Sequence, residues 1–292
     1  MKEGITVKKP AKYEAVIIPV PYEATASGEK GTAEGPKAVI EMLTYQIEDY
    51  DRFVKAVTSE KVNITPKEEL RVEGLKPEEM ISLVKKEVDK IKDSENTFLT
   101  ILGGEHSVSI GAIKSLKEKY KDLTVLQIDA HLDLRDDDSD YNIENPSKYS
   151  HCCVMRRARD LGCSTVQVGI RAIYSGELEY AEKEKILGTI FECPVKAKPE
   201  DIIKKISSKN VYLTIDVDGI DPSQMPGTGT PVQGGLDWYF VIKLLEKLFE
   251  KKNVVGADIV EVSPMPNNKL TELGAAQLLY HIIGFKYEKV LK

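Results

Sequence analysis

Apolar segments alternate with amphipathic segments along almost the whole chain. Short, mostly apolar runs, which predict buried strands, occur at residues 13–20, 97–102, 123–128, 165–170, 189–193, 211–215 and 254–262. Apolar residues at helical spacing predict helices at residues 37–50, 77–91, 105–120, 147–161, 176–186, 199–206, 236–249 and 270–283, and a short strand pair is expected within 54–64. This alternation predicts an α/β fold with a mostly parallel sheet between helices, in a single domain over residues 1–292.

Two of the predicted strands end in clusters of acidic residues. The run 123–128 is followed by Asp129, His131 and Asp133 at every second position. Because side chains alternate faces along an extended backbone, these three can project the same way. Asp216 and Asp218 follow the run 211–215 at the same spacing. Carboxylates placed this close repel each other unless a cation lies between them, so the two strand ends predict a metal site, and five ligands favour two ions.

The histidines are distributed in a way that supports this prediction. Ligands of open parallel sheets gather outside the carboxyl ends of the strands. Of the four histidines, His106, His131 and His151 follow such ends, as does the carboxylate of Glu261. His281 lies inside the apolar last helix, where a packed or capped core residue is expected.

The donor types indicate which metal and which chemistry. Carboxylates and imidazoles without thiolate form a hard-to-borderline set, which suits Mn²⁺, with Co²⁺, Ni²⁺ or Zn²⁺ as substitutes. Two ions about 3.5–4 Å apart can hold a hydroxide nucleophile at neutral pH. The residues therefore predict a binuclear metallohydrolase and leave its substrate open.

Charge and composition narrow the class of partner. The chain has 292 residues and a net charge of −6, which argues against binding to nucleic acid or an anionic membrane and leaves a cationic small molecule open. No apolar run approaches the ~20 residues of a membrane helix, and residues 1–12 do not resemble a signal peptide. The four cysteines contain no C-x-x-C pair, so a cytoplasmic location is expected. Cys152 and Cys153 follow His151, but a thiol nucleophile would make the carboxylate clusters superfluous.

Several of these residues stand in ordered motifs: GGEHS (103–107), DAHLD (129–133), SH (150–151) with Arg156, DVDGIDP (216–222), PGTGTPVQGGL (226–236) and EVSP (261–264). Over nearly its whole length the chain resembles the ureohydrolases, the arginase and agmatinase family. The resemblance implies the three-layer α/β/α fold of the arginase–deacetylase type. It also implies a homo-oligomer, a trimer or a hexamer.

The same resemblance implies roles for the site residues. One Mn²⁺ would be held by His106, Asp129, Asp133 and Asp216, and the second by His131, Asp129, Asp216 and Asp218. A hydroxide bridging the two ions, oriented by Asp133, would attack the guanidinium carbon of the substrate. Glu261 would pair with the guanidinium group, and His151 would shuttle a proton to the leaving amine.

The motifs are most similar to those of agmatinases, which implies hydrolysis of agmatine to putrescine and urea in polyamine synthesis. Arg135 opens an acidic loop that contains Asp136, Asp137, Asp138 and Asp140. This loop would suit a cationic or neutral substrate tail, or it is simply solvated. Because Arg135 could bind a carboxylate, arginine and guanidinobutyrate stay open beside aminopropylagmatine.

Two further alternatives are a non-catalytic metal-binding relative and a single-zinc deacetylase. The family usually has glycine where this chain has Cys152, which puts the detailed position of His151 in question.

Overall fold

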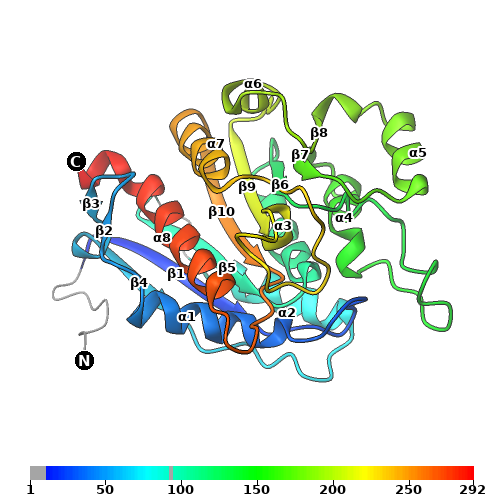
Figure 1. The fold of residues 1–292 in the computed structure, drawn as a ribbon, viewed down its shortest axis with the longest axis horizontal. Coiled ribbons are helices and arrows are strands. Elements are labelled where there is room, and N and C mark those ends of the chain that lie inside the picture. Colours follow the sequence, from blue (N-terminus) through cyan, green and yellow to red (C-terminus); the bar gives the residue numbers. More distant parts are fainter. Residues whose placement is uncertain (1–10, 92–94) are drawn as a thin grey trace.

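A computed structural model describes residues 11–91 and 95–292. Most of the amino-terminal segment in which no signal peptide is expected lies outside these residues. The strands of the main sheet are β1 (Tyr13–Val20), β4 (Val62–Pro66), β5 (Thr97–Gly103), β6 (Thr124–Ile128), β7 (Ser164–Ile170), β8 (Ile190–Glu192), β9 (Asn210–Asp216) and β10 (Asn253–Val260). They pair in parallel in the order β4-β1-β5-β10-β9-β6-β7-β8, so the predicted parallel sheet is confirmed (Figure 1).

Helices cover both faces of this sheet, which completes the predicted three layers. They are α1 (Gly35–Tyr45), α2 (Pro77–Asp89), α3 (Ser109–Lys119), α4 (Val154–Asp160), α5 (Ser175–Lys183), α6 (Pro199–Lys204), α7 (Trp238–Lys251) and α8 (Leu270–Leu291). Apolar residues of α1, α6, α7 and α8 belong to one core, and those of α2, α3, α4 and α5 belong to the other. Alternation along the strands explains the division, since Ala15 and Ile17 face the first core while Val16 and Ile18 face the second.

Several predicted helices have different ends in the structure. The helix expected over 37–50 ends at Tyr45. The chain then enters a turn in which the carboxylate of Asp51 accepts hydrogen bonds from the N–H groups of Phe53 (2.8 Å) and Val54 (3.2 Å). This turn joins the antiparallel strands β2 (Tyr50–Asp51) and β3 (Ala56–Val57). The expected strand pair is therefore present but lies earlier than predicted, and β4 joins the main sheet instead.

The helix expected over 147–161 is confined to α4, preceded by the 3₁₀ turn His151–Cys153. Asp138 accepts a hydrogen bond from the N–H of Ser147 (2.6 Å), and this contact holds the start of the segment in a loop. The last helix, in contrast, extends beyond the predicted 270–283 to Leu291.

His281 is a structural residue, as expected. Its Nδ1 lies 2.8 Å from Asp51 Oδ2, and its ring packs edge-on against Phe53. Among the described helices, none combines the length and the apolar character that crossing a membrane requires.

Candidate metal centre and pocket

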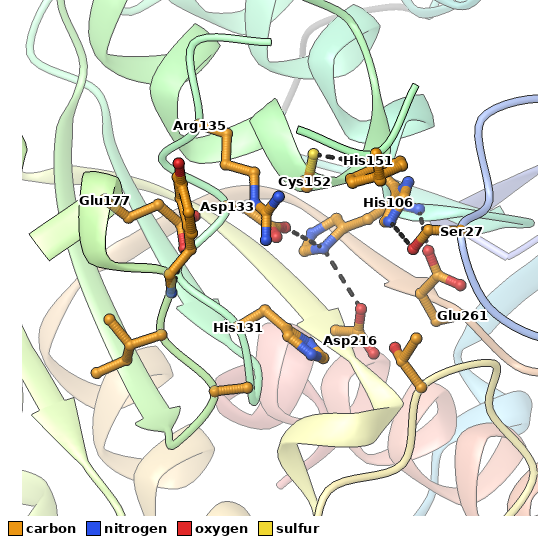
Figure 2. A pocket seen from close by; sticks show the side chains of 15 residues that line it. Ser27, His106, His131, Asp133, Arg135, His151, Cys152, Glu177, Asp216 and Glu261 are labelled. Carbon is orange, nitrogen blue, oxygen red and sulfur yellow. Dashed lines mark hydrogen bonds and ion pairs between the residues drawn. The ribbon is translucent and has the colours of Figure 1, made fainter. Parts of the chain in front are cut away.

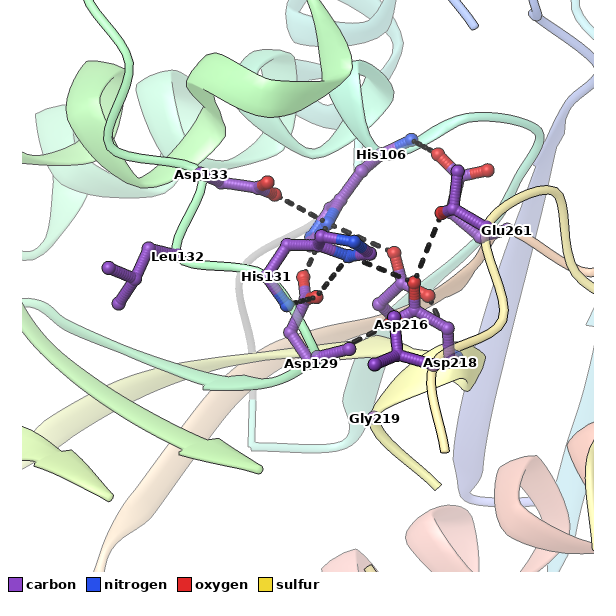
Figure 3. A network of polar contacts seen from close by, with 12 residues as sticks. His106, Asp129, His131, Leu132, Asp133, Asp216, Asp218, Gly219 and Glu261 are labelled. Carbon is purple, nitrogen blue, oxygen red and sulfur yellow. Dashed lines mark hydrogen bonds and ion pairs between the residues drawn. The ribbon is translucent and has the colours of Figure 1, made fainter. Parts of the chain in front are cut away.

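The candidate ligands lie at the carboxyl ends of four neighbouring strands. In the sheet, β5, β10, β9 and β6 are adjacent in that order. His106 follows β5, Glu261 follows β10, Asp216 ends β9, and Asp129 follows β6. The predicted convergence at one edge of the sheet is therefore confirmed (Figure 3).

His106 is surrounded by three carboxylates. Its Nδ1 lies 3.1 Å from Asp129 Oδ2, 3.0 Å from Asp133 Oδ2 and 3.5 Å from Asp216 Oδ2. All four residues are buried. His106, Asp129 and Asp216 form one group whose ligand atoms lie within 4.8 Å of one another.

A second group shares one carboxylate with the first. His131 Nδ1 lies 3.0 Å from Asp218 Oδ2 and 3.5 Å from Asp129 Oδ1. The ligand atoms of Asp129, His131 and Asp218 again fall within 4.8 Å of one another. Asp129 thus belongs to both groups, and the structure brings together all six predicted ligands.

The local backbone differs from the predicted alternation. Strand β6 ends at Ile128, and Asp133 has a left-handed φ of 52°, so Asp129, His131 and Asp133 do not all lie on one regular strand. Asp218 lies in the 3₁₀ turn Val217–Gly219, where its N–H donates to Asp216 Oδ1 (2.9 Å). Gly219 lets this turn approach β6, since a Cβ there would lie 2.6 Å from the backbone nitrogen of Asp129.

Buried polar side chains hold the ligands in place. Gln127 Nε2 donates to Asp129 Oδ2 (2.6 Å), and Gln127 in turn accepts a hydrogen bond from Gln167 (2.6 Å) on the neighbouring strand β7. Neither glutamine was expected at the site, although a glutamine in the middle of an apolar strand is a visible signal in the sequence. Such supporting contacts fix the orientation of metal ligands.

The hydrogen bonds behind His106 define its tautomer. Thr214 donates its hydroxyl hydrogen to Asp258 (2.6 Å), so its oxygen accepts from Nε2–H of His106 (2.8 Å). The lone pair of the neutral ring then lies on Nδ1. This buried Nδ1 has no hydrogen-bond partner, yet it points at three carboxylates. A nitrogen lone pair facing carboxylate oxygens suits a divalent cation, and the donors present fit the metal that the sequence predicts.

The pKa values of Asp133, Asp216 and His106 are all raised, which indicates that a positive charge would stabilise the cluster. Burial and the carboxylate of Asp129 raise the pKa of Asp133 to about 7. Burial and the nearby Asp218 and Asp129 raise the pKa of Asp216 well above its usual value. Burial opposes protonation of His106, but the surrounding carboxylates outweigh it and raise the pKa of the imidazole. The cluster therefore binds protons when it binds no other cation.

Glu261 lies beside the cluster with part of its carboxylate directed into the pocket. Its Oε1 accepts a hydrogen bond from the N–H of His106 (2.7 Å). Its backbone has a φ of 63°, which is unusual for a residue with a side chain and occurs at Asp133 as well. Burial and the neighbouring Glu105 raise the pKa of Glu261 to about 8. A cationic group placed at this carboxylate would restore its ionised form.

His151 also lines the pocket and lies next to Ser27 (Figure 2). Its Nε2 lies 3.0 Å from Ser27 Oγ and its Nδ1 3.2 Å from Ser150 Oγ, while its N–H donates to Thr25 Oγ1 (3.1 Å). Burial and the nearby His131 and His106 lower the pKa of His151 to about 4. Despite the neighbouring Cys152, the ring therefore faces the pocket as a neutral base. Neither Ser27 nor Thr25, which lie in the loop after β1, was expected at the site from the sequence.

The pocket extends from the cluster toward residues that the sequence did not indicate. It has a volume of about 460 Å³ and is lined by Ser27, His106, His131, Asp133, Arg135, Tyr141, His151, Cys152, Ala172, Ile173, Tyr174, Glu177, Asp216, Thr230 and Glu261. Tyr141 and Tyr174 are exposed at its mouth, whereas Glu177 is buried in its wall.

The acidic loop does not supply the carboxylates of this pocket. None of Asp136, Asp137, Asp138 and Asp140 is among its lining residues. Asp136 pairs with Arg157 (3.0 Å), and Asp140 pairs with Arg135. The acidic residues of this loop bond mainly within the loop and to α4, which fits the alternative that they do not face the substrate, whereas Arg135 of the same loop lines the pocket.

Comparison with known proteins identifies the family. The sequence profile of the arginase family matches residues 13–284. The chain belongs to this family. This ureohydrolase is 36% identical to the N(1)-aminopropylagmatine ureohydrolase of Thermus thermophilus over 96% of its own length and 93% of that protein. It is 31% identical to the agmatinase of Pyrococcus horikoshii, with 94% of this chain and 92% of that protein covered.

The fold comparison agrees. The crystal structure of the agmatine ureohydrolase of Thermoplasma volcanium superimposes with a TM-score of 0.81 at 30% identity, covering 99% of this chain and 97% of the other. The expected fold class is confirmed. The protein is a ureohydrolase, a hydrolase of linear amidines, with two His/Asp groups able to hold metal ions.

Proposed function

We propose that this chain is a binuclear Mn²⁺ enzyme that hydrolyses the guanidinium group of N(1)-aminopropylagmatine, releasing urea and spermidine. Agmatine, the main expectation from the sequence, becomes the second candidate. Sequence similarity supports this order, because identity is 36% with an aminopropylagmatine ureohydrolase and 31% with an agmatinase. The main observation behind the proposal is that two His/Asp groups share Asp129. Beside them lies the carboxylate of Glu261, of which only Oε1 accepts the hydrogen bond from the N–H of His106.

The residues present can hold two ions. His106, Asp129, Asp133 and Asp216 would hold the first, and His131, Asp129, Asp216 and Asp218 the second. When bound, two divalent cations neutralise these carboxylates and lower the pKa of water enough for nucleophilic attack at neutral pH.

Glu261 would orient the guanidinium group. One of its oxygens is fixed by the N–H of His106, and a planar guanidinium can donate two parallel hydrogen bonds to the remaining acceptor sites. This charge-assisted contact would hold the guanidinium carbon over the metal cluster, and Asp133 would accept a hydrogen bond from the attacking water. Fixing both reactants in this way removes much of the entropic part of the barrier.

His151 would move the proton that the leaving amine requires. The ring is neutral near pH 7, and its two nitrogens contact Ser27 and Ser150. It can therefore accept a proton from the attacking water at Nε2 and release it to the amine nitrogen.

The far wall of the pocket suits a cationic tail better than a carboxylate. The guanidinium of Arg135 pairs with Asp140 and stacks 4.6 Å from the ring centre of Tyr174, so its charge is already offset. Glu177 accepts hydrogen bonds from the N–H groups of Leu134 (2.8 Å) and Tyr174 (3.1 Å), and its remaining lone pairs are open to an amine. The ring faces of Tyr141 and Tyr174 that Arg135 does not cover can bind a second ammonium group. Arginine and guanidinobutyrate, which carry a carboxylate, are therefore disfavoured.

A panel of guanidino compounds tests the substrate. Urea release by the Mn²⁺-loaded enzyme should be most efficient with aminopropylagmatine, then agmatine, and least efficient with guanidinobutyrate and arginine. A higher kcat/KM for agmatine would make the second candidate correct. Arginine as the best substrate by a wide margin, or no release from any compound, would overturn the proposal.

We also infer that the chain forms a homo-oligomer, a trimer or a hexamer, and acts in the cytoplasm. Family resemblance supports the assembly, and four free thiols fit a reducing compartment. Light scattering on the purified protein measures the oligomer mass, and a monomer would contradict this part.

A further inference from the structure

Two cysteines that the proposed reaction does not use lie together in the pocket wall. Cys152 and Cys153 form one 3₁₀ turn with His151, and their Sγ atoms are 3.8 Å apart. Both are free thiols. Although Cys152 is only 8% exposed, it lines the pocket (Figure 2), so a small solute that enters the pocket can reach it.

The surroundings of the two thiols differ. Cys152 Sγ lies 3.2 Å from the hydroxyl of Tyr141, and hydrogen bonds from Cys153 and Tyr141 outweigh burial and lower the pKa of Cys152. Cys153 is fully buried, and its contact with Cys152 and its burial raise its pKa. Reactive cysteines are accessible and have a stabilised thiolate, which describes Cys152. Cys153 lies close enough to act as the resolving thiol, the one that forms a disulfide with an oxidised Cys152.

We propose that Cys152 and Cys153 form a peroxide-sensitive dithiol whose oxidation to a disulfide displaces His151 and stops the enzyme. The Cys152 thiolate attacks one oxygen of hydrogen peroxide, the O–O bond breaks, and after protonation water leaves a sulfenic acid on Cys152. The Cys153 thiol then attacks this sulfur and loses its proton, the S–O bond breaks, and a second water leaves. Two thiols are oxidised, and the peroxide is reduced by the same two electrons.

Formation of this bond must distort the turn that carries His151. The two sulfur atoms have to approach from 3.8 Å to about 2.05 Å within a ring that spans adjacent residues. The turn begins at His151, whose ring contacts Ser27 (3.0 Å) and whose N–H contacts Thr25 (3.1 Å). A change of the backbone at residues 151–153 therefore moves the group that we assign to proton transfer. The rate should fall about a hundredfold, a typical share for general acid–base catalysis.

Mass spectrometry of the treated holoenzyme tests the proposal without reference to any substrate. The Mn²⁺-loaded protein is exposed to hydrogen peroxide, quenched with catalase, alkylated and digested with trypsin. The peptide over residues 149–156 should be lighter by two hydrogens and carry no alkyl group, and dithiothreitol should restore both thiols and the urea-release rate. If both cysteines are alkylated after inactivation, the proposal is overturned. Formation of the disulfide in a protein that hydrolyses no guanidino compound would refute the proposed function and leave the dithiol assignment standing.

Serine variants separate this dithiol from other oxidation. Cys152→Ser should retain its own starting rate after peroxide. Cys153→Ser can form only the sulfenic acid on Cys152, so it should form no disulfide, and excess peroxide should oxidise Cys152 further to a sulfinic acid that dithiothreitol does not reduce. Cys163→Ser is the matched control, since Cys163 is buried outside the pocket lining, and it should respond like the unaltered protein. Equal loss of rate in Cys152→Ser would contradict the proposal. If a variant fails to fold, the mass of the 149–156 peptide from the unaltered protein still shows whether the disulfide forms.

Discussion

The two ends of the pocket are built in different ways. At the inner end, residues on or directly after β5, β6, β9 and β10 form a buried cluster whose carboxylates have fixed partners, such as Gln127 for Asp129. At the outer end, Arg135, Tyr141 and Tyr174 lie on loops and are at least partly exposed. The sheet therefore fixes the groups that would carry the chemistry before substrate arrives, whereas the loops would determine which substrate tail is accepted.

The strongest test of the inner end removes the carboxylate common to both groups. In Asp129→Ala, metal content should fall and urea release should drop at least about a thousandfold, because the ions supply the nucleophile. Elemental analysis and a urea assay measure the two effects. Asp137→Ala is the matched control, since Asp137 does not line the pocket and bonds only locally to Ser139. Full occupancy by two ions with an unchanged rate in Asp129→Ala would refute the site.

Glu261→Gln tests whether the inner end binds the guanidinium group separately from the metal. The variant should retain both ions but lose about thirtyfold in kcat/KM, because one charge-assisted contact is worth about 2 kcal/mol. Metal analysis beside steady-state kinetics distinguishes the two outcomes. Glu250→Gln, on the exposed surface of α7, should behave like the unaltered chain. Loss of metal in Glu261→Gln would show that this residue acts through the cluster instead.

Metal removal should make stability depend on pH at the inner end. Folding raises the pKa of Asp133 to about 7 and of Glu261 to about 8, so between pH 5 and 8 the folded chain holds protons that the unfolded chain has released. Stability of the metal-free protein should therefore fall as pH rises through this window, by about 5 °C in Tm. The pKa of His151 is lowered to about 4, so this residue has the opposite effect: between pH 4 and 6.5 it makes stability rise with pH.

Thermal unfolding in chelator, at several pH values and with Mn²⁺ added back, measures this dependence. Mn²⁺ should restore more stability near pH 8 than near pH 5. A flat Tm across the window, or an equal gain from Mn²⁺ at both ends, would show that folding does not raise the pKa values of Asp133 and Glu261.

At the outer end, Glu177→Gln should change specificity and little else. The KM for aminopropylagmatine should rise about tenfold, the cost of one charged hydrogen bond, with smaller effects on agmatine and on kcat. Glu179→Gln, an exposed residue of the same helix α5, is the control. A drop in kcat with an unchanged KM would mean that the outer end also takes part in the chemistry.

The inner end could be predicted from the sequence because its signals are local. Each ligand follows or ends an apolar strand, and parallel strands place their carboxyl ends at one edge. Even so, the prediction for Asp129, His131 and Asp133 relied on strand alternation, while the structure ends β6 at Ile128 and turns the backbone at Asp133. The three side chains do lie close together, but the regular strand that the pattern predicted ends before them.

The outer end could not be predicted, because its contacts join distant segments. Thr25 lies in the loop after β1 but contacts His151, 126 positions away. The acidic residues of the loop after Arg135 looked suited to a cationic tail, yet they pair with Arg135, Arg157 and nearby backbone groups. A buried carboxylate away from the metal-ligand cluster, Glu177, comes instead from α5, and no spacing rule singles it out.

Anomalous diffraction from crystals grown with Mn²⁺ tests the central claim most directly. We expect two anomalous peaks in each chain that share Asp129 and Asp216, one beside His106 and the other beside His131. A single peak, or none at these side chains while the fold is intact, would contradict the binuclear site.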